Sequence, residues 1–187
     1  MQKLIIYRKS LTFKWWIVLP ILIMSLSTLS CKKDRARAAF EMRYFLEFDV
    51  TAGANLFTYH QYPVQKIPTG IDFFLDQNSI EANEIITINT SFARLSSQFE
   101  NEDLSIIDEI IIDLFIPSDP SRNYEAAYTL QIPIRKQSRV QLVPSITNLR
   151  DVLTGEEYDM VAYIRFRGIP PRSFTALLEI GFDVFKE

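Results

Sequence analysis

The chain is poor in the residues that carry most enzyme and metal chemistry. Its single cysteine, Cys31, excludes an internal disulfide, so the fold must be held by its core. Its single histidine, His60, excludes a His-rich metal site, and any Ser-His-Asp or Cys-His site would have to use that ring. The five glycines are scattered and form no phosphate-binding, dinucleotide-binding or G-x-S-x-G motif. We therefore expect a protein that is not an enzyme and that holds no cofactor.

Acidic residues are absent before Asp34, and this bears on the N-terminal segment. A basic stretch (Lys3, Arg8, Lys9, Lys14) precedes an apolar run over residues 15–24 and a small-residue stretch over 25–30. A secretory signal has this order, with an apolar region of about 7–15 residues. Residues 15–29 are fewer than the roughly 20 that a spanning helix needs, and Pro20 interrupts them. We expect residues 1–30 to be a cleaved signal peptide, the alternatives being an uncleaved anchor or a secreted protein without lipid.

The tetrapeptide Thr28-Leu29-Ser30-Cys31 resembles the lipobox of bacterial lipoproteins processed by signal peptidase II, in the looser form of Bacteroidetes envelope lipoproteins. The resemblance covers about the first 35 residues. It implies cleavage between Ser30 and Cys31 and a diacylglycerol thioether on Cys31, with fatty acyl chains such as palmitate. Lys32 stands where an Asp would mark inner-membrane retention, so the resemblance implies delivery to the outer membrane. Whether the protein faces the periplasm or the cell surface stays open.

Residues 31–38 are expected to form a lipidated Cys and a short tether. The stretch 32–37 holds four cations and one anion. Stable anchoring takes more than one acyl chain, which a diacyl Cys31 provides. Each cation near an anionic lipid surface adds about 1 kcal/mol, and the alternative reading is a flexible solvated linker.

The remaining residues, 39–187, suffice for one domain with its own core. Residues 38–187 contain 12 Lys and Arg against 22 Asp and Glu. Such an acidic body is a poor match for nucleic acid, whose binding depends on cations that neutralise phosphates. No internal repeat of 20–50 residues is visible, which argues against a solenoid.

Alternating apolar residues predict a series of strands. The alternation is clearest near the two ends of this domain, over 40–50 and 176–184. The run 106–116 reads as a central strand, or as a short helix that turns into a strand. Further strands are expected at 58–64, 85–95, 127–134, 140–143 and 158–166, with 127–134 and 140–143 as a hairpin around the basic turn 135–138.

Turn-forming residues separate these runs at 67–70, 117–121 and 168–171. One helix is expected, capped by Ser145, ended by Gly155, and apolar at Ile146, Leu149, Val152 and Leu153. The pattern predicts an all-β fold, a two-sheet β-sandwich that is immunoglobulin-like in general architecture, with one short crossover helix. The alternative is a lipid-facing barrel of alternating strands.

Three groups of side chains are candidates for chemistry. Carboxylate pairs could serve a glycosidase, although nothing requires them to converge and Asp108 and Asp113 have opposite parity on a strand; they are Glu100, Glu102 and Asp103, Glu156 and Glu157, and Asp108 with Asp113. A loop calcium site could use Asp76, Asn78, Glu81 and Glu84, although the run lacks the EF-hand pattern. Aromatic residues could line a sugar-binding platform but more often fill a core; they are Phe57, Tyr59, Tyr62, Phe73 and Phe74.

These observations favour a membrane-anchored envelope lipoprotein that binds or scaffolds a protein partner. The alternative is an accessory lipoprotein that captures a glycan or peptide for uptake. A carboxylate-based hydrolase is the third possibility. The sequence names no ligand-binding residue.

Overall fold

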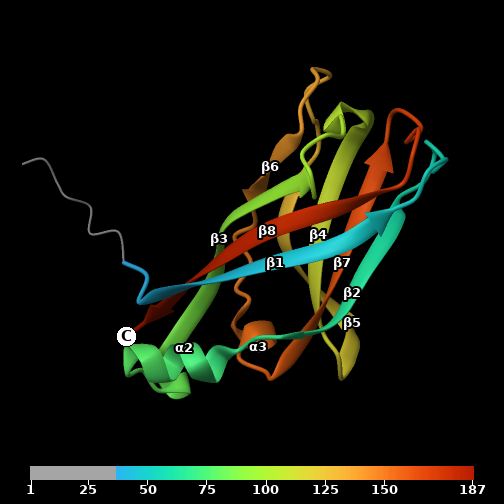
Figure 1. The fold of residues 1–187 in the computed structure, drawn as a ribbon. Coiled ribbons are helices and arrows are strands. Elements are labelled where there is room, and N and C mark those ends of the chain that lie inside the picture. Colours follow the sequence, from blue (N-terminus) through green and yellow to red (C-terminus); the bar gives the residue numbers. More distant parts are fainter. Residues whose placement is uncertain (1–36) are drawn as a thin grey trace, which may run out of the picture. The chain divides into compact units, whose positions relative to one another are not determined.

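The computed structural model describes residues 37–187 (Figure 1). Cys31, the cleavage position at Ser30 and most of the tether therefore lie outside the described residues. Eight strands follow one another along the chain: β1 Phe40–Val50, β2 His60–Pro68, β3 Ile85–Ser97, β4 Ile107–Ile116, β5 Asp119–Thr129, β6 Arg139–Pro144, β7 Glu157–Phe166 and β8 Phe174–Lys186. The prediction of an all-β fold is confirmed.

The strands form one antiparallel sheet in the order β1-β8-β3-β6-β5-β4-β7-β2. The predicted two-sheet sandwich was wrong, because β6 joins what would have been two separate sheets. The first half of β6 pairs with β3, where Leu95 lies opposite Val140. Its end pairs with β5, where Ala127 lies opposite Pro144. A six-residue strand that changes partner along its length turns two halves into one continuous sheet.

The sheet folds over so that its two halves face each other (Figure 1). Aromatic rings from the two halves meet in the space between them. Tyr44 on β1 lies edge-on to Tyr158 on β7 at 5.7 Å, and Phe48 on β1 stacks with Tyr62 on β2 at 5.4 Å. Such aromatic pairs add to the stabilisation that area burial gives. Tyr158 is fully buried, and this desolvation raises the pKa of its hydroxyl.

Alternation explains why most strands form where they were predicted. In β1 the even-numbered side chains from Met42 to Val50 face the core, with Tyr44 only partly buried, and β8 continues the pattern. The run 106–116 is strand β4, preceded by a single 3-10 turn, Leu104–Ile106. The predicted hairpin 127–134 with 140–143 is misplaced, since β5 begins at Asp119 and ends at Thr129. Residues 117–118 alone form the turn between β4 and β5, so most of the predicted loop 117–121 belongs to β5.

The helices differ most from prediction. A helix that the pattern did not indicate, α2 Ile71–Asn78, follows Gly70, whose φ of 59° lies in the left-handed region open to glycine. The expected helix is reduced to one turn, α3 Arg150–Leu153. Ser145 does not cap it; the Asn148 carboxamide accepts from the Arg150 amide and from the Ile88 amide instead. None of the helices in residues 37–187 has the length and apolarity that crossing a membrane would require.

Candidate functional site

Strand direction alternates along the chain, so every second connection lies at the same end of the sheet. Val50, the last residue of β1, is paired with Phe174, the first residue of β8. Ile107, the first residue of β4, is paired with Phe166, the last residue of β7. Four connections thus share one end, which we call the loop end (top of Figure 1); they are residues 51–59, 98–106, 130–138 and 167–173.

Hydrogen bonds hold the four loops to one another. The Gly53 amide donates to the Pro170 carbonyl at 3.1 Å, which links the first loop to the last. The Leu104 amide donates to the Gln137 carbonyl at 2.8 Å, which links the second to the third. Gly53 has a φ of 75°, a conformation that a larger residue adopts only with strain. The loop end is therefore a tied surface built from four segments distant in sequence.

Asp103 is central to this linkage. Its carboxylate accepts from the Ser105 amide at 3.0 Å and from the Gln137 amide at 3.2 Å. The hydrogen bond from the Ser105 backbone, helped by those from the Ser105 side chain and the Gln137 backbone and by the charge of Lys136, lowers the pKa of Asp103 below its ordinary value. The carboxylate therefore acts as a structural acceptor that joins loop 98–106 to loop 130–138.

Every loop of this end exposes a large apolar side chain to solvent. Phe99 is 78% exposed and Ile134 is 82% exposed. The full set is Phe57, Phe99, Leu130, Ile134 and Ile169. Single exposed apolar residues are ordinary on protein surfaces, but a group at one end of a domain is typical of an interaction site.

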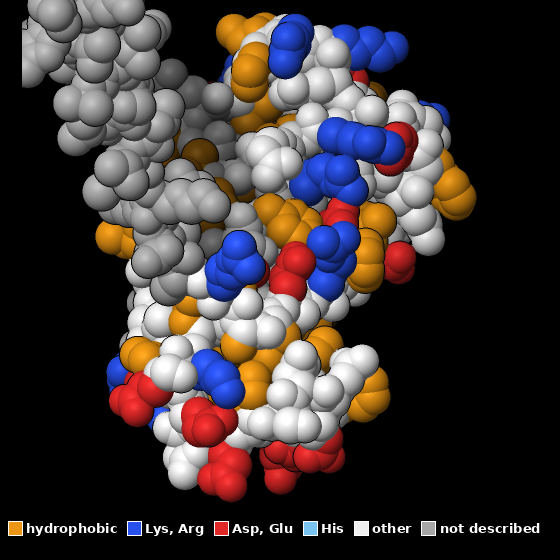
Figure 2. Space-filling view, turned by 90° about the vertical axis from the view of Figure 1, so that its left-hand side faces the viewer, with side chains coloured by type: hydrophobic (Ala, Val, Ile, Leu, Met, Phe, Trp, Pro, Cys, Tyr) orange, Lys and Arg blue, Asp and Glu red, His pale blue; other side chains and the backbone are white. Residues whose placement is uncertain are grey.

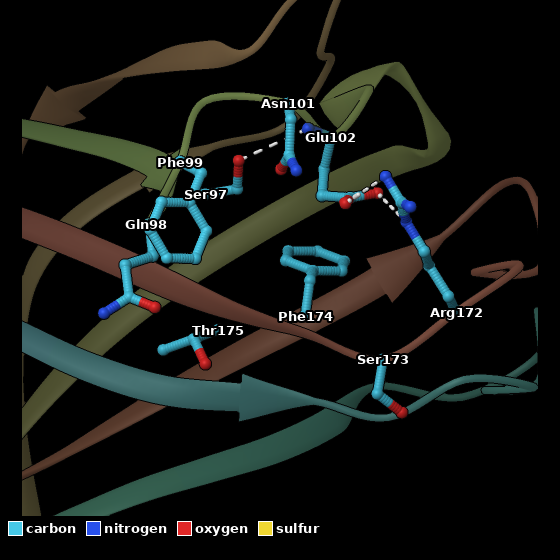
Figure 3. A pocket seen from close by; sticks show the side chains of 9 residues that line it. All are labelled: Ser97, Gln98, Phe99, Asn101, Glu102, Arg172, Ser173, Phe174 and Thr175. Atoms are coloured by element: carbon cyan, nitrogen blue, oxygen red, sulfur yellow. Dashed lines mark hydrogen bonds and ion pairs between the residues drawn. The ribbon is translucent and has the colours of Figure 1, made fainter.

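A cleft of about 240 Å³ opens between loop 98–106 and the start of β8 (Figure 3). Phe174 lies between Phe99 and an ion pair that Arg172 makes with Glu102 at 2.7 Å. The Glu102 amide donates to the Ser97 hydroxyl at 3.3 Å, which fixes the chain beside the ion pair. The cleft thus combines an aromatic ring with a paired cation and anion.

A second hollow of about 550 Å³ borders the same ion pair. It shares Arg172, Glu102 and Phe174 with the first cleft. Its remaining lining consists of the polar or charged residues Asn101, Asp103 and Lys136 and the apolar residues Ile106 and Pro171. The two hollows together form a groove that runs between the loops.

An ionic cluster supports the loop end from the neighbouring sheet surface. Asp108 pairs with Arg165 at 2.9 Å and with Arg167 at 2.8 Å, and Arg165 also pairs with Glu109. Tyr59 donates to Glu109, and this hydrogen bond raises the pKa of the tyrosine hydroxyl. The cluster joins β4, β7 and the end of loop 51–59, so its charges are largely satisfied by one another.

The opposite end of the sheet has a different charge. The connection 69–84 contains four acidic residues and no basic one, and the connection 145–156 contains two acidic residues and one basic one. We call these two connections the acidic end. Figure 2 shows acidic side chains gathered at the bottom, where α2 lies, and cations higher on the same face. The loop end by contrast has three acidic and four basic residues in its four loops.

The candidate carboxylates do not form a catalytic pair. Glu100 pairs with Arg139, and Glu102 pairs with Arg172, while Asp103 holds backbone amides. Asp113 is buried and accepts from the Asn123 carboxamide at 2.9 Å. A register shift between Ile107 and Glu109 interrupts the alternation from which opposite faces were expected for Asp108 and Asp113. Glu156 and Glu157 lie exposed at the acidic end.

The expected calcium ligands serve local structure. Glu81 and Glu84 form a reciprocal capping box at the 3-10 turn Ala82–Glu84. Asn78 donates its side-chain amide to the Phe74 carbonyl at 2.8 Å, and Asp76 lies on α2. Within residues 37–187, no group of three or more His, Cys, Asp and Glu side chains is placed to hold a metal ion.

The five candidate aromatics do not form one platform. Tyr62 is buried in the core, and Phe74 packs in parallel against Phe40 at 6.0 Å. Phe57 and Tyr59 are exposed at the loop end, whereas Phe73 is exposed on α2 at the acidic end. His60 is partly exposed, and its Nε2 lies 3.0 Å from the Asn55 carbonyl oxygen.

Reasoning from the sequence missed the residues that shape the groove. Phe99, Arg172 and Phe174 carry no motif, and they come from segments more than 70 residues apart. The predicted succession of strands contained a usable signal. If consecutive strands run in opposite directions, every second connection lies at the same end of the sheet. That rule would have grouped loop 98–106 with loop 167–173.

No protein-family model matches the chain, and no curated protein matches it. Among the solved structures that resemble it is a chain of the X-ray structure of Tomato Aspermy Virus, at 10% sequence identity and a TM-score of 0.28. That likeness covers 90% of this chain and 94% of the viral chain. A TM-score of this size supports no argument about fold or function, so the site rests on its own geometry.

Proposed function

We propose that the protein is an envelope lipoprotein, lipidated on Cys31 and delivered to the outer membrane, whose β domain binds a protein partner through the loop end. The observation that carries the binding role is the exposure of large apolar side chains on all four loops of one end. Interface centres are enriched in aromatic and apolar residues with arginine, and Phe99, Ile134 and Arg172 supply these types.

The position of the loop end suits a protein anchored by Cys31. The described chain enters β1 at Phe40, which is paired with Val184 near the end of β8, at the acidic end. From there β1 rises through 11 residues, at about 3.3 Å each, to the loop end. A lipid on Cys31 would therefore hold the acidic end nearer to the membrane and leave the loops about 35 Å further along the strand.

The charge of the acidic end limits how closely it can approach the membrane. An anionic lipid surface attracts the cations of the tether and repels the carboxylates of residues 69–84. The acidic end would thus be kept from lying flat against such a surface. The repulsion falls off within about 8–10 Å at physiological salt, so it acts only when the domain approaches the membrane.

Two experiments test the proposal. Radiolabelled palmitate should label the wild-type protein and should be absent from C31S; equal labelling of both would remove Cys31 as the lipid attachment site. A photoreactive phenylalanine analogue at Phe99 should crosslink a defined neighbour in intact cells. The matched position is Phe73, which is 67% exposed at the acidic end, where no adduct is expected. Adducts of equal yield from both positions, or from neither, would contradict a binding role for the loop end.

A further inference from the structure

We infer that the loop end binds an acidic protein segment that also carries bulky apolar side chains, with the tip of loop 130–138 at the centre of the contact. The inference rests on the proposed function, because it names the partner chemistry of the same surface. Three observations carry it: a fixed protruding tip, two cations that take part in no ion pair within residues 37–187, and a groove beside them.

The tip is held on both sides. Ile132 is buried, and its amide donates to the Asp108 carbonyl at 3.2 Å. Gln137 is held through its amide by Asp103 and through its carbonyl by the Leu104 amide. Residues 133–136 project between these two anchors, and this loop rises above its neighbours in Figure 1. A fixed tip loses little conformational entropy when it binds.

The tip presents one apolar side chain and two cations. Ile134 is exposed, and so are Arg135 and Lys136. Among the ion pairs of residues 37–187, neither Arg135 nor Lys136 takes part.

The other cations of this end already have carboxylate partners. Arg172 pairs with Glu102, and Arg139 pairs with Glu100. Arg167 pairs with Asp108. Asp103 binds two backbone amides and keeps its negative charge beside Lys136, so Arg135 and Lys136 together leave one positive charge without a counter-charge in these loops. The charge left over at the loop end is therefore positive, in a domain that is otherwise strongly acidic. A positive patch favours encounter with a negative partner and suppresses wrong ones.

The groove decides between a protein segment and a lipid surface. The hollow of about 550 Å³ beside the tip has apolar walls from Ile106, Pro171 and Phe174. A side chain of a protein segment can enter such a hollow, whereas the flat surface of a bilayer would leave it unfilled. A peptide segment with alternating apolar and acidic side chains can place the apolar ones in the groove and the acidic ones against the cations of the tip.

The test uses the full chain, purified in detergent, and three sets of synthetic 12-residue peptides of matched length. One set is acidic with leucine and phenylalanine, one is basic with the same apolar residues, and one is acidic without them. We expect the wild type to bind the acidic apolar set about tenfold more tightly than either of the others. Equal affinity for the three sets would overturn the inference.

The variant R135E/K136E should lose the preference for acidic peptides, and I134A should weaken binding of the acidic apolar set about tenfold. Matched controls lie at or near the acidic end. K66E/R122E makes the same change in net charge, and I146A removes a side chain that is 99% exposed. Both controls should bind as the wild type does. If both R135E/K136E and I134A still preferred the acidic apolar peptides as the wild type does, the tip of loop 130–138 would not be the centre of the contact.

Vesicles containing phosphatidylglycerol provide the alternative outcome. If they bind the protein through Arg135 and Lys136 while no peptide set is preferred, the surface is directed to lipid and the inference fails. Crosslinking from Phe99 separates this failure from that of the proposed function. A defined protein adduct from Phe99 without peptide preference would leave the binding role standing and remove only the acidic partner.

Discussion

The two ends of the sheet are closed in different ways. At the acidic end α2 and α3 turn apolar side chains inward, and Ile71, Leu75, Val152 and Leu153 are buried. At the loop end Ala54, Leu104 and Ile132 reach the core, while hydrogen bonds between loops provide the remaining contacts. Phe57, Phe99 and Ile134 stay outside. Both ends thus bury apolar residues, but the loop end also exposes the larger number, five against Phe73 and Ile146 at the acidic end.

The difference extends to charge. The acidic end has an excess of carboxylates, which keeps a surface soluble and discourages association. The loop end pairs most of its charges internally and leaves cations and apolar groups exposed. The larger number of exposed apolar groups at the loop end is what the proposed binding role requires. Substitution of buried residues at the acidic end should therefore affect stability, whereas substitution of exposed residues at the loop end should affect binding.

The largest effect on stability is expected at the acidic end. Leu153→Ala removes a fully buried side chain from α3 and leaves a cavity where helix and sheet meet. We expect the free energy of unfolding to fall by about 2–5 kcal/mol, measured by chemical denaturation. The matched change of an exposed apolar residue, Phe99→Ala, should alter it by no more than about 0.5 kcal/mol. Similar losses for both would mean that Phe99 contributes to the fold, and the contrast between the ends would disappear.

A smaller effect is expected where the loop end is tied together. Asp103→Ala leaves the Ser105 and Gln137 amides without their acceptor. We expect a loss of about 1 kcal/mol, because the carboxylate is partly exposed and water replaces part of the interaction. Hydrogen exchange should also become faster at Gln137 and Ser105. Asp76→Ala at the acidic end is the control, and slower or unchanged exchange in Asp103→Ala would contradict the role of this carboxylate.

The pH dependence of stability follows from the same carboxylate. The pKa of folded Asp103 lies below its unfolded value, about 3.9, so its contribution is fully present above that value. The contribution is lost as the pH falls through the lower folded pKa. The difference in unfolding free energy between wild type and Asp103→Asn should therefore be constant near pH 6 and shrink below about pH 4. A difference that grows on acidification would mean that folding raises the pKa of Asp103 instead of lowering it.

The strands were predictable because burial of one face imposes a period of two. β1 was predicted with its bounds, and β8 was placed to within two residues at each end. In both strands every second side chain is apolar and faces the core, as Met42 and Phe182 do. Pairing was not predictable, because the alternation of β6 is compatible with either neighbour. The partner change of β6, on which the single sheet depends, is a property of the assembled fold.

The helices and the groove show where local pattern is insufficient. In α2 only Ile71 and Leu75 are buried, and exposed Phe73 blurs the helical face, so the pattern gave no signal. The sequence marked the basic turn 135–138 and the acidic stretch 100–103 as separate loops. Their approach depends on strand order, and so does the pairing of Glu102 with Arg172. A site formed by loops distant in sequence can therefore be recognised only once the order of the strands in the sheet is known.

The smallest effect on stability should accompany the largest effect on binding. Ile134→Ala removes an exposed side chain from the tip of loop 130–138, and Ile146→Ala removes one from the acidic end. Neither should change the free energy of unfolding by more than about 0.5 kcal/mol, because neither side chain is buried in the fold. In cells, Ile134→Ala should reduce the yield of the adduct formed from the photoreactive residue at Phe99, while Ile146→Ala should leave it unchanged. If both variants lowered the yield equally, surface hydrophobicity in general, rather than the loop end, would govern the interaction.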